Sequence, residues 1–230
     1  GLRVENLEYQ NHLEDMVRRK SRELTNALQR TRDSFEFTLR AMTTMLDSRE
    51  HATGAHSQRV QDITELVGKE IGIQGKLLDD LKQGALLHDI GKIAIPDAIL
   101  LKPGPLTEEE WVIMRTHAQI GYDIIRTSPD LKGAAKIVGC HHENWDGNGY
   151  PNGLSEEEIP IGARIFALAD AYDAMRSDRP YRAGMPPEDA TAELHKHRGS
   201  QFDPKLVDVF LGITDQIEAI GKWAEENEKA

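Results

Sequence analysis

The chain has 230 residues, of which 39% are hydrophobic and 29% charged, and its formal net charge at pH 7 is -11. No apolar run approaches the length of a membrane-spanning helix, and the acidic balance argues against a nucleic-acid polymer as partner, because a phosphate backbone requires a basic face. The single cysteine, Cys140, cannot form an internal disulfide. We therefore expect a cytoplasmic protein that binds a small anion through a local positive site, with metal ions as the source of that charge. Because the sequence begins with Gly1, we expect a fragment of a longer protein.

Residues 1–46 are polar, helix-forming and free of proline. Such a helix is unstable alone in water. Apolar side chains recur along it at heptad spacing, in two runs joined by a one-residue slip: Leu13, Val17, Leu24 and Ala27, then Leu28, Phe35, Met42 and Leu46. The pattern predicts a parallel coiled coil that forms a homodimer and links the chain to a missing upstream sensor or receiver domain. The alternative is a single helix packed on the flank of its own domain.

The stretch from Leu86 to Lys92 places His88, Asp89 and Lys92 inside an apolar run that is predicted to be a buried helix. On one helix Lys92 would lie beside the other two side chains, whereas His88 and Asp89 would diverge by about 100°. Such neighbours can bind one metal ion together, or the carboxylate can reach a second ion. A core salt bridge is the alternative, because an unpaired buried charge is costly.

Apolar periodicity predicts helices through the rest of the chain, whereas residues 93–106, with three prolines, predict a loop. A capping box of Thr107 and Glu110 opens a helix that would bury Trp111 and extend past residue 120. Several helices carry side chains of the metal-ligand type on or beside an apolar face. These side chains are His56, His88, Asp89, His117, His141, His142 and Asp170.

Five histidines and two carboxylates are too rich in nitrogen for magnesium or calcium. They suit iron or manganese, with nickel or zinc as alternatives. If these seven side chains form two groups that share Asp89, each metal ion has about four protein ligands. Two ions about 3.5 to 4 Å apart can generate a bridging hydroxide and bind the attacking and leaving oxygens of a displacement at phosphorus. The pattern thus indicates a binuclear phosphohydrolase.

Three arginines gather around Tyr181: Arg176, Arg179 and Arg182. Planar guanidinium groups suit phosphate, and solvated arginines at a helix end are the alternative. Cys140 precedes two histidines, but a cysteine on such an apolar helix is interpreted as buried packing rather than as a nucleophile.

The motifs of the chain follow one another in a fixed order between residues 47 and 217. They are Thr53-Gly54-Ala55-His56, His88-Asp89-Ile90-Gly91-Lys92, His117, His141-His142-Glu143, Gly149-Tyr150-Pro151, Ala169-Asp170-Ala171-Tyr172-Asp173, Arg179-Pro180-Tyr181-Arg182 and Gln201-Phe202-Asp203-Pro204. This series resembles the HD-GYP family of bacterial cyclic di-GMP phosphodiesterases, a branch of the HD superfamily.

The resemblance implies an all-α HD-domain helical bundle over residues 47–218, preceded by the linker of residues 1–46 and followed by a helical tail, 219–230. It implies that Asp89 and Lys92 take part in catalysis, with Lys92 on the scissile phosphate. It also implies that Arg179, Tyr181 and Arg182 bind substrate, and that the loop Gly149, Tyr150, Pro151 binds diguanylate cyclase domains. It implies two ions, one held by His56, His88, Asp89 and Asp170 and the other by Asp89, His117, His141 and His142.

The chain departs from the family at Ala52. Members with three metals carry glutamate at this position, four residues before the first histidine, so we expect two ions and no third site. We expect hydrolysis of cyclic di-GMP to the linear dinucleotide pGpG, with GMP as a minor product. One alternative is the same chemistry on another cyclic dinucleotide. Another is an inactive nucleotide receptor that signals through the coiled coil, although the complete ligand set argues against it.

Overall fold

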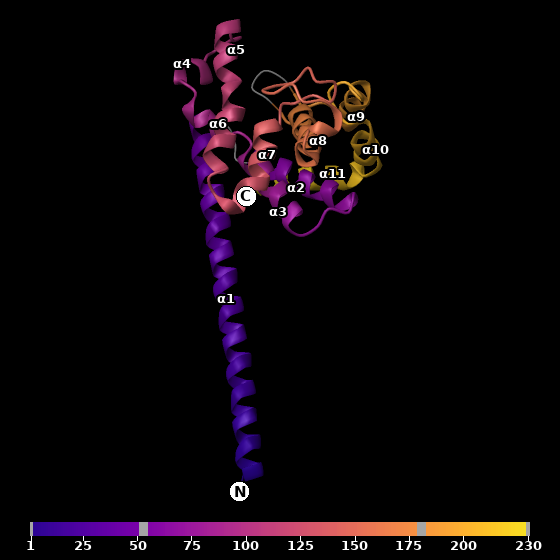
Figure 1. Cartoon of the computed structure of the whole chain (residues 1–230). Helices are drawn as coiled ribbons and strands as arrows, with labels where there is room; N and C mark the ends of the chain where they lie inside the picture. The colour runs from indigo at the N-terminus through magenta and orange to yellow at the C-terminus, as the bar shows by residue number, and fades with distance from the viewer. Residues whose placement is uncertain (1, 51–54, 179–182, 229–230) are drawn as a thin grey trace. The chain divides into compact units, whose positions relative to one another are not determined.

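The computed structural model describes the backbone of residues 2–50, 55–178 and 183–228, and the side chains of residues 10–49, 56–178 and 183–221. These residues form α-helices and short 3-10 helices, and none of them forms a β-strand, so the all-α prediction is confirmed. The helices, labelled in Figure 1, are α1 (Leu2–Glu50), α2 (Ala55–Glu70), α3 (Lys76–Leu87), α4 (Asp97–Leu100), α5 (Glu108–Met114), α6 (Thr116–Ile125), α7 (Lys132–Cys140), α8 (Ile161–Arg176), α9 (Pro187–Lys196), α10 (Pro204–Gly212) and α11 (Thr214–Glu228). The 3-10 helices are η1 (Ile90–Ala94), η2 (Pro129–Leu131) and η3 (Glu156–Glu158).

The chain divides into two compact units, residues 1–41 and 42–230. The first unit consists of the greater part of α1, coloured indigo in Figure 1. Its heptad side chains are uncovered, with exposed fractions of 46% at Leu13, 57% at Val17, 62% at Leu24 and 62% at Leu28. Among the described helices, none combines the length and the apolar character that spanning a bilayer requires.

The core of the second unit lies where α2, α8 and α10 meet. The apolar face of α2 is buried through Val60, Ile63 and Val67. Across it, the rings of Tyr172 and Phe210 pack edge to face with centroids 5.2 Å apart. Proline opens α9 and α10 at their first helical position, where the missing N–H group leaves no hydrogen bond unmade. This packing fixes α8, the helix that carries Asp170.

The predicted continuous helix through Lys92 is wrong, because α3 ends at Leu87. The chain turns at His88 and Asp89, and residues 90–94 form η1 instead. The reason is tertiary: η1 passes so close to α6 that a Cβ atom added at Gly91 would lie 1.9 Å from the carbonyl oxygen of His117. Only glycine fits this crossing, which brings the His88-Asp89 turn beside α6.

Two other predicted boundaries also change. The loop predicted for residues 93–106 contains the helix α4, which Pro96 precedes with a φ of -60°. The helix predicted from Thr107 has its capping box, but it divides at Arg115 into α5 and α6. None of the residues of α5 is buried, and Trp111 is 41% exposed rather than in the core.

The last turn of α1 belongs to the second unit and is tied to η1 by Arg49. Its guanidinium donates to the carbonyl oxygen of Ile95 at 2.7 Å and to those of Lys92 and Ile93 at 3.2 Å. Its Nε also donates to the Asp97 carboxylate at 2.9 Å. One side chain thus binds three carbonyl groups at the end of η1, including that of Lys92, which also accepts from the backbone N–H of Ile95.

We expect Gly91→Ala to lower the free energy of unfolding by about 3 kcal/mol, because the added methyl group meets backbone that cannot rotate away. Gly212→Ala is the control, since an added Cβ there meets no atom within 4 Å. It should change stability by at most about 1 kcal/mol, in the stabilising direction. Urea unfolding measures both variants. A Gly91→Ala chain of wild-type stability would show that η1 and α6 can separate without cost.

Candidate metal centre

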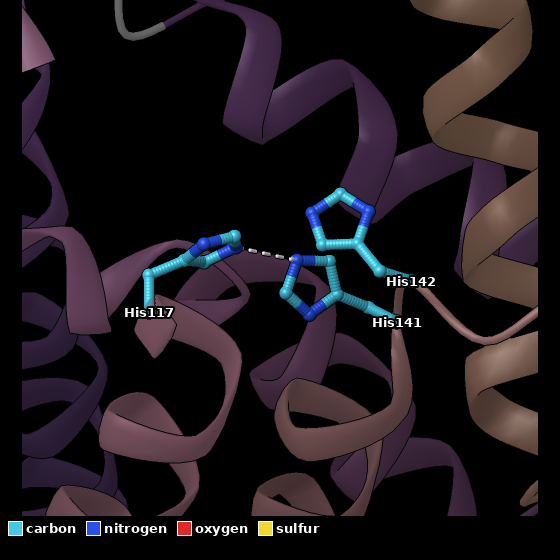
Figure 2. Close-up of side chains that lie close together, drawn as sticks. All are labelled: His117, His141 and His142. Atoms are coloured by element: carbon cyan, nitrogen blue, oxygen red, sulfur yellow. Dashed lines mark hydrogen bonds between the residues drawn. The ribbon is translucent and has the colours of Figure 1, made fainter. Parts of the chain in front are cut away.

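Three histidines converge where α6 and α7 lie side by side (Figures 1 and 2). His117 comes from the first turn of α6, and His141 and His142 directly follow α7. One ligand atom of each lies within 4.8 Å of the others. The Nε2 atoms of His117 and His141 are 3.3 Å apart, as the dashed line in Figure 2 marks. We call His117, His141 and His142 the first triad.

The tautomers of two of these rings follow from their backbone contacts. Nδ1 of His117 donates to the carbonyl oxygen of Met114 at 2.7 Å, and Nδ1 of His141 donates to that of Val138 at 2.6 Å. In the neutral rings both Nε2 atoms then carry lone pairs. Two lone pairs this close repel each other unless a cation or a proton lies between them, so the arrangement suits a shared positive ion.

Protonation of the first triad is disfavoured. Burial, together with the charge of His88, lowers the pKa of His141 to about 3. Burial also lowers the pKa of His117 and of His142. The rings are therefore neutral at pH 7, which is the form that binds a metal ion.

The second triad consists of His56, His88 and Asp170, which also offer ligand atoms within 4.8 Å of one another. Nδ1 of His88 donates to the carbonyl oxygen of Ala85 at 2.8 Å, and Nε2 of His56 lies 3.4 Å from the Asp170 carboxylate. Although burial favours the neutral ring, Asp170 and Asp173 raise the pKa of His56 to about 10. A metal ion would compete with this proton for the same lone pair.

Asp89 lies between the two triads. One carboxylate oxygen is 3.0 Å from Nε2 of His88, and the other is 3.5 Å from Nε2 of His117. Nζ of Lys92 is 2.8 Å from the first of these oxygens. Burial opposes ionisation, but the charges of His88 and Lys92 keep the pKa of Asp89 well below its usual value. The structure thus brings together all seven ligand-type side chains that the sequence singles out.

A neighbouring carboxylate, Asp173, was not assigned to the site by sequence reasoning. It is 4% exposed, and it accepts hydrogen bonds from Nδ1 of His56 at 2.7 Å and from Nε of Arg59 at 2.6 Å. The hydrogen bond from Nδ1 of His56 directs Nε2 of the same ring toward Asp170. Carboxylates outside a metal site orient metal-binding histidines in this way. The signal was the matched spacing of three residues in His56-Arg59 and Asp170-Asp173, which places each pair on one helix face.

The loop after the first triad is built around a buried carboxylate. Glu143 accepts hydrogen bonds from the backbone N–H groups of Asn152 and Leu154 at 2.8 and 3.1 Å. The N–H of Tyr150 donates to the carbonyl oxygen of His142, and the two rings stack with centroids 4.6 Å apart. Burial, together with Asp89, raises the pKa of the Tyr150 hydroxyl. The loop that contains Gly149, Tyr150 and Pro151 is therefore fixed to the triad.

A protein-family model described as "HD domain" matches residues 40–206. The chain belongs to the HD domain family. A cyclic di-GMP phosphodiesterase of Thermotoga maritima is 43% identical over 188 residues, which are 80% of this chain and 51% of that protein. The 3'3'-cGAMP-specific phosphodiesterase 2 of Vibrio cholerae is 41% identical over 177 residues, which are 76% and 34% of the two chains. The sequence-based resemblance is confirmed by these relatives.

The fold agrees with that of a solved structure. The crystal structure of a cyclic GMP-AMP specific phosphodiesterase of V. cholerae matches with a TM-score of 0.61 and 23% identity, and the match covers 77% of this chain and 48% of that one. The chain spans about half the length, or less, of the relatives it matches.

An HD domain binds divalent metal, and the donors of this chain fit that chemistry. Imidazole nitrogens supply most of each triad, and Asp170 and Asp89 add oxygen. This mixture suits first-row transition ions better than magnesium or calcium. The lone pairs of His117 and His141 already face a common point, which is the arrangement that a metal ion requires.

Some predicted site residues lie outside the described residues: Ala52, Arg179, Tyr181 and Arg182. Arg176 is described, and its guanidinium pairs with the Glu218 carboxylate at 2.6 Å, so it braces α8 against α11. Cys140 is half-buried, and burial raises the pKa of its thiol to about 11. That value disfavours the reactive thiolate, in agreement with a packing role.

We expect Asp173→Asn to weaken metal binding by the HD domain about 10-fold to 100-fold. The asparagine side chain can still accept the hydrogen bond from His56, but it lacks the negative charge that makes the imidazole a stronger ligand. Asp203→Asn is the matched control. Asp203 is 3% exposed and pairs with Arg164 at 2.7 Å, but it touches none of the triad residues. Metal titration against a chelator measures the affinity. Equal affinity in the two variants would contradict the orienting role of Asp173.

Proposed function

We propose that the chain is a metal-dependent phosphodiesterase that hydrolyses cyclic di-GMP to pGpG in the cytoplasm. The observation that carries the proposal is the position of Asp89 between the two triads, with Lys92 against the same carboxylate. The ordered HD-GYP motifs and the name of the T. maritima relative support the choice of substrate. 3'3'-cGAMP is the second candidate, because a relative from V. cholerae with that specificity in its name is 41% identical.

We infer that two transition-metal ions bind per chain, with iron or manganese preferred and nickel or zinc as alternatives. When bound, the ions supply Lewis acidity toward the phosphate and activate a water molecule as nucleophile. Asp89 would be shared between the two ions. One would be held by His56, His88, Asp89 and Asp170, and the other by Asp89, His117, His141 and His142.

Backbone carbonyls and side chains of the HD domain would organise the reaction. Backbone carbonyls and Asp173 hold the Nδ1 atoms of four histidines, which keeps the Nε2 atoms directed into the site. Lys92 is placed to bind a non-bridging phosphate oxygen and to stabilise the charge that develops at phosphorus. Hydrolysis then breaks one P–O3' bond and leaves a free 3'-hydroxyl and a terminal 5'-phosphate. Substrate binding by Arg179, Tyr181 and Arg182 rests on the family motif alone.

We expect the metal-loaded chain to convert cyclic di-GMP to pGpG, with little GMP, as separated by chromatography. Lys92→Ala should retain its metal and lose roughly 100-fold in kcat, the effect of removing one preorganised charge. Lys102→Ala is the control, because Lys102 pairs with Glu110 at 2.6 Å instead of with a triad residue.

Parallel assays with 3'3'-cGAMP distinguish the two candidate substrates. A metal-loaded wild type that cleaves neither would refute the proposed function. A Lys92→Ala chain with wild-type kcat would refute only the role of Lys92.

We also infer that residues 1–46 form a parallel dimeric coiled coil, because the seam residues Leu13, Val17, Leu24 and Leu28 are exposed. At the end of the seam Leu46 is buried instead, so it is not available to a partner helix. The double variant Leu24→Glu and Leu28→Glu should convert a dimer to a monomer without loss of metal, as measured by sedimentation. Arg22→Glu with Gln29→Glu is the control, since it adds negative charge outside the seam. A dimeric seam variant would place the interface elsewhere.

Diguanylate cyclase domains are the proposed protein partner, through Gly149, Tyr150 and Pro151. The exposure of Pro151 and Asn152 supports access to this loop. Its attachment to His142 through Tyr150 would connect such binding to the metal site.

A further inference from the structure

Four side chains form a stack that leads from the surface of α5 to the first triad. The guanidinium carbon of Arg115 lies 5.9 Å from the ring centroid of Trp111 and 5.3 Å from that of Tyr150. Tyr150 in turn stacks on His142, with an angle of 25° between the ring planes. Arg115 is thus one ring away from a proposed metal ligand. We call Trp111, Arg115, Tyr150 and His142 the aromatic stack.

The charge of Arg115, unlike that of other arginines near the site, is not paired with a carboxylate in the part of the chain that the structure describes. Arg59, Arg164 and Arg176 each pair with a carboxylate, at distances of 2.6 to 2.7 Å. Arg115 is exposed, and within the described ranges it contacts two aromatic rings and no carboxylate. In a chain of net charge -11, an arginine without a carboxylate partner can form an ion pair with an anionic ligand.

The N–H donors of the guanidinium are not taken up by the protein. Arg115 lies near two aromatic rings, and among the described residues its guanidinium donates no hydrogen bond to a protein acceptor. A guanidinium beside aromatic rings keeps its planar edge of N–H donors for hydrogen bonding. That edge forms paired hydrogen bonds with two adjacent acceptor atoms, such as two phosphate oxygens or O6 and N7 of guanine. Trp111, with 41% of its surface exposed, adds a flat face on which a base can stack. A cyclic dinucleotide carries both kinds of acceptor.

We infer that Arg115 binds the substrate away from the bond that is cleaved, through paired acceptors on the second phosphodiester or on a guanine edge. The inference rests on the proposed function, since it assigns a substrate contact to that site. The role of Tyr150 then includes holding Arg115, in addition to any contact with a protein partner. The contact would increase the affinity for the whole cyclic dinucleotide and would leave the rate of attack at phosphorus nearly unchanged.

The test compares a large and a small substrate. For the metal-loaded Arg115→Ala chain we expect KM for cyclic di-GMP to rise about tenfold or more, with a much smaller change in kcat. Bis(p-nitrophenyl) phosphate has neither a second phosphodiester nor a base. The fold-change in its KM should therefore be at least about tenfold smaller than that for cyclic di-GMP. A purely structural disturbance of α5 or α6 would affect both substrates alike.

Two further variants keep the test sharp. Arg126→Ala is the matched control, because Arg126 is also exposed and lies 5.7 Å from a tyrosine ring, that of Tyr122, at the other end of α6. It should change neither KM. Arg115→Lys retains the charge without the planar edge, and it should also raise KM for cyclic di-GMP. This variant decides the matter if Arg115→Ala does not fold.

Cyclic di-AMP, used as an inhibitor, distinguishes the two acceptors because it has the same phosphates without O6. An inhibition constant that rises with KM in Arg115→Ala indicates the phosphodiester. An unchanged constant, or no inhibition of the wild type, indicates the guanine edge.

Two failures can be told apart. A wild-type KM for cyclic di-GMP in both Arg115 variants would overturn this inference alone. A wild type that cleaves the small diester but no cyclic dinucleotide would overturn the proposed substrate and this inference with it.

Discussion

The arrangement of the site depends on Asp89, whose two carboxylate oxygens face histidines of different triads. That position exists because α3 stops at Leu87 and the chain turns before η1. The turn is stabilised from outside the motif, by the close crossing of Gly91 over the backbone of His117 and by the hydrogen bonds of Arg49 to η1. A continuous helix would carry Asp89 along the axis of α3 and away from α6. The irregular backbone is therefore what joins the two triads.

Three hydrogen bonds that lie at helix ends also orient three histidines. His88, His117 and His141 each donate from Nδ1 to the carbonyl oxygen three residues earlier, at the ends of α3, α5 and α7. Carbonyl groups at a helix end lack partners within the helix, so the bond satisfies them and fixes the ring tautomer at once. Replacing one of these histidines would thus remove a ligand and also leave a helix end without its partner. His56 differs, because it begins a helix and its Nδ1 is held by Asp173 instead.

The sequence was sufficient to predict the helical class and the set of ligand-type residues. Both are carried by residue type and local periodicity, as at Val60 and Ile63 of α2, which are buried as expected. The turn at Asp89 was not predicted, because it follows from a contact between distant segments. The break at Arg115 coincides with the hydrogen bond from His117 to the carbonyl oxygen of Met114, which apolar periodicity does not reveal. Nothing in the pattern around Gly91 reveals that His117, 26 positions later in the sequence, approaches it. The exposure of Trp111 was missed for the same reason, since an apolar residue at helical spacing is usually part of the core.

The charge distribution explains why an acidic chain can recognise an anion. Three carboxylates lie in or beside the triads: Asp89 and Asp170 are half-buried, and Asp173 is buried. Desolvation makes their negative charge costly without compensation. Arg59 pairs with Asp173, Lys92 contacts Asp89, and protonated His56 lies against Asp170 and Asp173. These cations are held by the carboxylates, so they leave no excess positive charge for an anion. Bound metal ions would add positive charge at the place where we propose that a phosphate binds, beside Lys92. The proposed affinity for a dinucleotide would therefore depend on metal loading, because the carboxylates and their partner cations alone supply no net positive charge to a phosphate.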